Sequence, residues 1–267
     1  AKLVCFDADE DAIRFAQKRL SVFADRVVFV HSNISSIEPE LLSRSIHAID
    51  GLLLDLGVSS FQLDDAAKGF SFRADERIDM RMDRRQKLSG WDVVNQYAEE
   101  ELAELLWEYG EERNSERIAN RIVARRPIET TVALRDAVRL AAGERFLMKT
   151  LARVFQAIRI EVNDELRNLE RVLRSTVEIL SPGGRMVVIS YHSLEDRIVK
   201  DFLRRNAATS VASGNKYVPD TVVTPTLKML TKKPVVASPS EVERNPRARS
   251  AKLRAAERIG RAQRKTL

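Results

Sequence analysis

The 267-residue sequence contains little cysteine or histidine and lacks long apolar runs. Its single cysteine, Cys5, excludes an intramolecular disulfide bond and a zinc site made of several thiolates. The three histidines do not have the spacing of metal ligands, so we expect no metal site. No run approaches the roughly 20 apolar residues that cross a bilayer, and the first residues lack a signal-peptide pattern. These absences favour a cytoplasmic protein that does not span a membrane.

Positive charge is concentrated near the end of the sequence. The chain has 45 Lys and Arg residues against 39 Asp and Glu residues, and residues 244–267 contain nine basic residues and one acidic residue. Arginine can bind a phosphate through two parallel hydrogen bonds, and bound cations release the counterions of a nucleic acid. This basic tail is therefore predicted either to bind a phosphate backbone or to form a solvated basic helix or frayed end.

Short apolar runs alternate with helical patterns in the first part of the sequence. Residues 2–6, 26–30 and 51–57 are strand-like, and residues 12–20 have apolar side chains at helical spacing. Such strands, apolar on both faces, indicate a parallel sheet in an α/β fold. Because ligands of these folds bind beyond the carboxyl ends of the strands, a binding site is expected there.

The pattern changes after the third strand. Residues 65–150 contain helical patterns and no strand-like run, and residues 151–180 are predicted to form one long helical region. A strand is expected at 185–190 and an irregular loop at 207–240. Because the later strand needs the earlier strands as partners, we predict an all-helical domain at 65–150, inserted into a sheet domain. The boundaries predicted for the sheet domain are 1–64 and 151–267.

Asp7 stands between the first predicted strand and the following helix. Nucleotide-binding α/β enzymes place a carboxylate after a strand, where it accepts hydrogen bonds from ribose hydroxyls. The alternative is an aspartate that caps the helix, although Asp9 could perform that role instead.

A denser group of polar residues follows the third strand. Asp55 ends an apolar run, and Ser59, Ser60 and Gln62 come shortly after it. A carboxylate, two hydroxyls and a carboxamide at a strand end can hold a polar ligand. A simple capped turn is the alternative.

Two later segments also contain candidate functional residues. In residues 69–83, Phe72 could stack on a base while Arg73 meets a phosphate, as in single-stranded RNA binding. The alternative is that the aromatic residues fix this loop to the core. His192 follows the last predicted strand and could act as a general base. The adjacent Ser193 lacks the Gly-x-Ser-x-Gly pattern of a hydrolase nucleophile.

Several long motifs occur in one order along the chain. They are Asp55-Leu-Gly-Val-Ser-Ser60, Gln62-Leu-Asp-Asp65, Gly69-Phe-Ser-Phe72, Asp79-Met-Arg-Met-Asp83, Tyr109-Gly-Glu-Glu-Arg113, Phe155-Gln-Ala-Ile-Arg-Ile160 with Val162-Asn163, Pro182-Gly-Gly184, the segment 192–200, and Asn245-Pro-Arg-Ala-Arg-Ser250. Together they closely resemble the MraW-type family of ribosomal RNA small-subunit methyltransferases. The resemblance extends from the first strand to the basic tail.

The resemblance implies a class I, Rossmann-like methyltransferase domain with an inserted helical domain. It further implies methyl transfer from S-adenosyl-L-methionine to the exocyclic N4 of a cytidine in the decoding region of 16S ribosomal RNA, in the 30S subunit. By position, Asp7 would bind the cofactor ribose, and Asp55 and Gln62 would hold the adenine-to-methionine part. Ile34 stands where the family usually has a phenylalanine against the adenine, so an aliphatic contact would replace stacking.

The proposed chemistry adds further expected roles. An amine conjugated with its ring is a poor nucleophile, and a hydrogen-bond acceptor for its N–H makes it more reactive. The residues expected to supply this acceptor are Asp55, Ser59, Ser60 and His192. Contacts to the target nucleotide are expected from Phe72, Arg73 and the segment 190–197, and contacts to RNA phosphates are expected from Arg247, Arg249 and Lys252.

One departure from the family and two other functions complete the sequence-based picture. The family's first strand and glycine-rich loop should precede Ala1, so we expect the sequence to be truncated at its N-terminus. A non-catalytic RNA-binding factor for ribosome assembly is an alternative that the basic tail favours. A nicotinamide dehydrogenase is a weaker alternative, because it also needs an acid at the position of Asp7.

Overall fold

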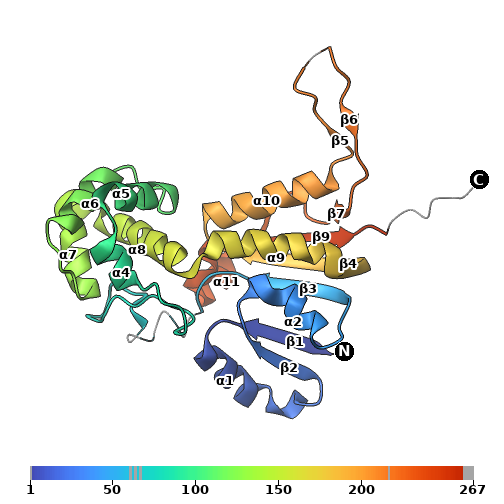
Figure 1. Ribbon diagram of the computed structural model, residues 1–267, viewed down its shortest axis with the longest axis horizontal. Helices are drawn as coiled ribbons and strands as arrows, with labels where there is room; N and C mark the ends of the chain where they lie inside the picture. The colour runs from blue at the N-terminus through green and yellow to red at the C-terminus, as the bar shows by residue number, and fades with distance from the viewer. Residues whose placement is uncertain (1, 60–61, 63–64, 66–67, 216, 261–267) are drawn as a thin grey trace, which may run out of the picture. The chain divides into compact units, whose positions relative to one another are not determined.

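The computed structural model describes residues 2–59, 62, 65, 68–215 and 217–260, and it combines helices with parallel strands (Figure 1). The chain divides into two compact units. The first unit consists of Ala1–His31 and Val58–Glu165, and the second consists of Ser32–Gly57 and Leu166–Leu267. The mixed α/β class expected from the sequence is confirmed, whereas the domain boundaries expected at 65 and 150 stay a prediction. No helix in the described residues is long and apolar enough to cross a bilayer.

The first unit begins with a strand, a helix and a second strand. β1 (Leu3–Asp7) pairs in parallel with β2 (Val27–His31), and α1 (Glu10–Arg19) connects them, followed by the short helix η1 (Ser21–Phe23). Asp9 caps α1, whose acidic first turn and basic last turn both suit the helix dipole. Asp7 and His31 are partners in the register, so the two carboxyl ends lie side by side.

Helices around one apolar core form much of the remainder of the first unit. They are α4 (Gly90–Gln96), α5 (Glu99–Glu108), α6 (Ser115–Val123), α7 (Thr131–Ala142), η4 (Glu144–Phe146) and α8 (Leu147–Asn163). Apolar side chains at helical spacing, such as Leu102, Ile118 and Leu134, are completely buried in this core. Within residues 65–150 these helices begin at Gly90, whereas residues 69–89 form an irregular segment with one isolated bridge between Arg77 and Thr130, so the expected all-helical domain stays a prediction.

A sheet with the strand order β3-β4-β9-β7 forms the centre of the second unit. Its strands are β3 (Ile49–Asp55), β4 (Leu180–Ser190), β7 (Leu227–Met229), β8 (Val235–Val236) and β9 (Lys252–Arg258). β3 and β4 are parallel, whereas β9 is antiparallel to β4, β7 and β8. β3 and β4 are neighbours in the sheet, so the chain passes through all of α4 to α9 between two paired strands.

The helices of the second unit follow or precede these strands. They are η2 (Ile34–Ser36), α2 (Ile37–Leu42), most of α9 (Glu165–Ile179), α10 (Ser193–Ala207), α11 (Pro239–Arg244) and η5 (Pro246–Ser250). α10 packs against β4, β7 and β9. Figure 1 shows α10 running along the same sheet, before the chain turns into a narrow hairpin. The hairpin pairs β5 (Ser210–Val211) with β6 (Thr221–Val222).

Two expectations about local structure differ in detail from the structure. The long helical region expected at 151–180 is divided into α8 and α9, because Asp164 adopts a left-handed conformation with φ 49°. The apolar pattern continues through this break, so periodicity could not reveal it. The loop expected at 207–240 contains short strands and the first residues of α11, since strands of two or three residues are too short to show an alternating pattern.

The basic tail also differs from the expectation of a solvated helix or frayed end. Residues 252–258 form β9, which lies between β4 on one side and β7 and β8 on the other. Arg254 in this strand is 5% exposed, and its guanidinium binds both carboxylate oxygens of Asp196 at 2.7 and 3.2 Å. Part of the positive charge in the tail therefore belongs to the core of the sheet.

Candidate functional site

The carboxyl end of β1 presents a partly buried carboxylate. Asp7 Oδ1 accepts a hydrogen bond of 2.8 Å from the backbone N–H of Asp9, and Oδ2 accepts none from the described residues. Burial raises the pKa of the Asp7 carboxyl above its ordinary value, and the hydrogen bond from Asp9 opposes only part of this shift. Asp7 therefore has one oxygen fixed by the turn and one available to a ligand.

Three polar side chains next to this turn are almost completely buried. Asp9, Gln62 and Lys68 are each 2–3% exposed. Asp9 Oδ2 accepts hydrogen bonds from Gln62 Nε2 at 2.8 Å and from Lys68 Nζ. Gln62 Oε1 accepts a hydrogen bond of 2.8 Å from the Ser59 N–H. Both ends of the Gln62 carboxamide, which was predicted to hold the cofactor, thus have partners within the protein.

Of the two serines predicted at the site, the structure describes Ser59 only. Ser59 Oγ accepts a hydrogen bond of 3.1 Å from the backbone N–H of Gln62, so its hydroxyl caps the following turn. Ser60 lies outside the described residues. The expected role of both serines near the reacting amine stays a prediction.

In the second unit, the ends of β3 and β4 bring Asp55 and Tyr191 together. The Tyr191 hydroxyl donates a hydrogen bond of 2.9 Å to Asp55 Oδ1. Burial raises the pKa of Tyr191 to about 12, with a further contribution from this hydrogen bond. Tyr191 is therefore protonated at neutral pH and keeps Asp55 in an orientation where its other oxygen can accept a hydrogen bond. Ile34, the predicted adenine contact, is half-buried at the start of η2.

His192 directly follows this tyrosine and begins α10. The backbone N–H groups of Tyr191 and His192 both donate to Glu195 Oε2, at 2.8 and 3.4 Å. His192 Nε2 lies 3.2 Å from Glu195 Oε1, within ion-pair distance, but the geometry is not that of a hydrogen bond. Glu195, which is 2% exposed, thus fixes the segment in which the predicted general base stands.

Phe72 and Arg73, which are expected to contact the target nucleotide, lie in the first unit. The Phe72 ring packs edge-on against Phe155, with ring centroids 5.3 Å apart, so the core occupies part of its surface. Arg73 is exposed. Asn163 fixes the adjacent loop, since its amide binds the Met80 carbonyl and the Met82 N–H, both at 2.8 Å. This packing favours a structural role for Phe72, and its contact to RNA stays a prediction.

The residues of the basic tail have different environments. Arg247 and Arg249 are exposed in η5, whereas Lys252 begins β9 with its Nζ 3.5 Å from Asp196 Oδ2. Burial raises the pKa of Asp196, but the hydrogen bonds and charge of Arg254, with that of Lys252, lower it more, so the net shift is downward. Lys252 therefore has a partner within the protein, and phosphate binding by these residues stays a prediction.

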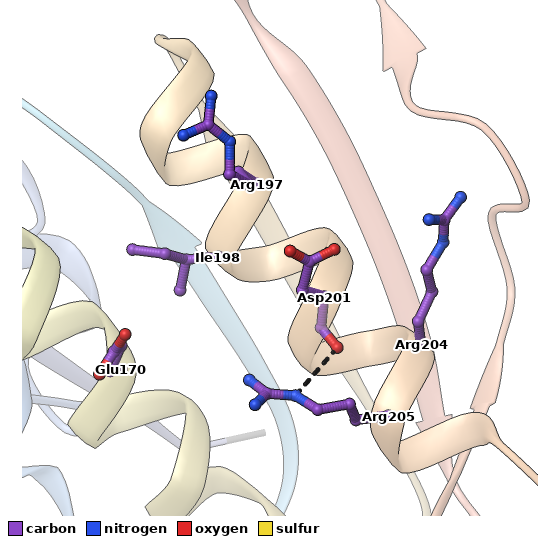
Figure 2. A pocket seen from close by; sticks show the side chains of 6 residues that line it. All are labelled: Glu170, Arg197, Ile198, Asp201, Arg204 and Arg205. Carbon is purple, nitrogen blue, oxygen red and sulfur yellow. Dashed lines mark hydrogen bonds between the residues drawn. The ribbon is translucent and has the colours of Figure 1, made fainter. Parts of the chain in front are cut away.

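A shallow groove between α9 and α10 contains further arginines (Figure 2). It has a volume of about 490 Å³ and is lined by Glu170, Arg197, Ile198, Asp201, Arg204 and Arg205. Arg205 Nε donates a hydrogen bond of 3.3 Å to the Asp201 carbonyl, as the dashed line in Figure 2 shows. Arg204 points away from these two residues in the same view. Its three arginines make the groove a second arginine-containing surface of this unit, which serves below as a control for RNA binding by the basic tail.

The sequence did not reveal Lys68 and Arg254 as supports of the site, and it gave no individual role to Tyr191 and Glu195 within the predicted segment 190–197. Tyr191 stands beside the predicted His192, so its position after a strand was a usable signal. Lys68 and Arg254 act through aspartates 59 and 58 residues away in the chain, and no local pattern connects them.

Comparisons with a family model and with individual proteins agree on one family. Residues 1–259 match the MraW methylase family. A protein of Carboxydothermus hydrogenoformans named ribosomal RNA small subunit methyltransferase H is 49% identical over 97% of this chain and 85% of its own length. Proteins of the same name from Geotalea uraniireducens and Clostridioides difficile are 48% and 44% identical, over 96% and 95% of this chain and 84% of their own lengths. The chain therefore belongs to the MraW methylase family.

Proposed function

We propose that this protein transfers a methyl group from S-adenosylmethionine to the exocyclic N4 of a cytidine in the decoding region of small-subunit ribosomal RNA, in the cytoplasm. The observation that supports this most directly is the placement of Asp7 and Asp55. Each ends a parallel strand, where α/β enzymes bind their ligands, and both lie within the residues that match a methylase family. The names of the relatives supply the substrate class.

The available hydrogen-bond acceptors of Asp7 and Asp55 fit the cofactor. Asp7 has a carboxylate oxygen without a protein partner in the described residues, and ribose presents two hydroxyl donors. Asp55, fixed by Tyr191, can accept a further hydrogen bond. In this proposal Ile34 packs on the adenine and Gln62 acts through its contact with Asp9.

In the proposed methyl transfer, the protein mainly has to align the two substrates and accept a proton from the amine. When bound, the cofactor supplies a methyl group that is already activated by its sulfonium. The chain must exclude water and accept a hydrogen bond from the amine as its lone pair attacks. Asp55, Ser59, Ser60 and His192 remain the proposed acceptors, without a single assigned base. A base splayed out of the RNA could reach them.

The activity can be tested by methyl transfer to immature small subunits. We expect the full-length protein to transfer label from methyl-labelled S-adenosylmethionine to N4 of one cytidine, and Asp55→Ala to lose at least about tenfold in rate, because it removes a charged acceptor. Asp25→Ala is the control, since that carboxylate is exposed in the first unit. Binding to the subunit without transfer would instead support the assembly-factor alternative. Family membership disfavours the dehydrogenase.

Binding of RNA by the tail predicts a specific dependence on salt. In Arg247→Gln/Arg249→Gln, we expect weaker RNA binding and a salt slope reduced by about 0.7 log unit for each single-strand phosphate that the variant no longer neutralises. Cofactor affinity should not change. Arg204→Gln/Arg205→Gln in the groove of Figure 2 removes the same charge and is the control. An unchanged slope in the tail variant, or weaker binding confined to the groove variant, would remove the tail from the RNA site.

A further inference from the structure

A buried ion pair next to Asp7 is not explained by the chemistry above. Lys68 and Asp9 are 3% and 2% exposed, and their charged groups are in direct contact. Removing two charges from water costs several kcal/mol per ion, so a buried pair of this kind is weak evidence for stability alone. Its position at the turn that presents Asp7 suggests another role.

Two hydrogen bonds that both involve Asp9 connect Lys68 to Asp7. Lys68 Nζ donates to Asp9 Oδ2, and the Asp9 N–H donates to Asp7 Oδ1 at 2.8 Å. Asp9 Oδ1 accepts a hydrogen bond of 3.0 Å from the Asp11 N–H, which caps α1. Lys68 Nζ also lies 3.3 Å from Asp11 Oδ2. The ammonium group therefore fixes both the helix cap and the backbone donor that orients the Asp7 carboxylate.

The backbone of Lys68 is fixed from the other side. Its carbonyl accepts a hydrogen bond of 2.9 Å from the Met80 N–H, and Met80 is completely buried. The next residue, Gly69, has φ +67°, and a Cβ there would lie 2.9 Å from the Asp79 nitrogen. A glycine is thus required for this close approach. Lys68 consequently connects the loop of residues 79–83 to the turn at the end of β1.

We infer that Lys68 is a positioning residue for the cofactor site: through Asp9 it orients the Asp7 carboxylate toward the ribose hydroxyls. Gln62 supports the same turn, because its Nε2 donates to the same Asp9 oxygen. The hydrogen bonds from Lys68 and Gln62 outweigh the effect of burial and lower the pKa of Asp9, so its acceptor form is kept. This inference rests on the proposed function, since it presumes that Asp7 binds the cofactor.

A double-mutant cycle distinguishes positioning from general stabilisation. We expect Lys68→Met to weaken binding of S-adenosylmethionine by about tenfold in calorimetry on the folded, full-length protein. In an Asp7→Ala background the same change should weaken binding less than about twofold further, because the two residues act through one contact. Lys68→Arg should restore most of the affinity. Lys18→Met, which removes an exposed lysine from α1, is the control and should bind as the wild type does.

Three outcomes would overturn the inference. They are unchanged affinity in Lys68→Met with only a lower melting temperature, additive losses in the double variant, and a wild-type protein that does not bind the cofactor. If Lys68→Met does not fold, Lys68→Gln, which removes the charge and keeps an N–H donor group, replaces it in the same cycle. Binding is measured separately from methyl transfer, so a protein that binds the cofactor without transferring methyl would overturn the proposed function and leave this inference standing.

Discussion

Replacing Arg254 with alanine is expected to lower the free energy of unfolding by about 3–5 kcal/mol. The change leaves the Asp196 carboxylate, whose side chain is 14% exposed, without the guanidinium that binds both of its oxygens. Lys252 Nζ is 3.5 Å from Asp196 and can replace only part of this interaction. Chemical denaturation at neutral pH measures the effect.

The same pair predicts a dependence on pH. The pKa of Asp196 is lower in the folded protein than in the unfolded chain, so its stabilisation is complete above the unfolded value of about 4 and is lost as pH falls through the folded value. The difference in stability between wild type and Arg254→Ala should therefore shrink in acid.

Arg185 provides a matched control in the same sheet. It pairs with Glu257 at 3.1 Å between β4 and β9, but its side chain is 67% exposed. Exposed pairs contribute about 0–1 kcal/mol, so Arg185→Ala should have a small effect. Equal effects of the two substitutions would show that burial of the Arg254 pair does not determine its contribution.

Replacing Asp7 with alanine is expected to weaken binding of S-adenosylmethionine by about 100-fold, because two hydrogen bonds to a charged acceptor are lost. Isothermal calorimetry on the full-length protein measures the change. Since burial raises the pKa of Asp7, wild-type affinity should also begin to fall at a higher pH than for an ordinary aspartate as the solution is acidified.

Two comparisons make the Asp7 result specific. Asp7→Asn keeps an oxygen for the Asp9 N–H and should lose less affinity than Asp7→Ala while removing the pH dependence. Asp25→Ala should bind as the wild type does, since that carboxylate is exposed. Wild-type affinity in Asp7→Ala would remove Asp7 from the cofactor site.

Local patterns in the sequence predicted the elements that bury apolar runs. β1 and β3 were expected because residues 2–6 and 51–57 contain short apolar runs followed by polar residues. β9 was missed because charged residues at 252, 254, 257 and 258 conceal a strand whose Arg254 is neutralised by a distant aspartate. In the sequence alone, a charged residue that is buried cannot be distinguished from an exposed one, because its partner is not known.

In the candidate site too, the sequence predicted some of the functional residues and not others. Asp7 and Asp55 were predictable because each directly ends a strand. The role of Gln62 in fixing Asp9 was not, since it depends on which side chains meet across the fold. Asp164 gave no signal either, because its left-handed backbone interrupts a helical pattern without changing it.

The order of strands in the second unit has a consequence for how the chain folds. β3 pairs with β4 although Asp55 and its partner Ile189 are separated by most of the helices, and β9, between β4 and β7, comes late in the sequence. Contacts between distant residues form slowly, whereas helices with neighbouring partners form quickly. During synthesis on the ribosome, the helices α4 to α8 can pack around their apolar core before β4 is available to pair with β3. The backbone N–H and C=O groups along one edge of β4 then remain unpaired until β9 has been synthesised, so the nascent chain carries an open strand edge until late in its own translation.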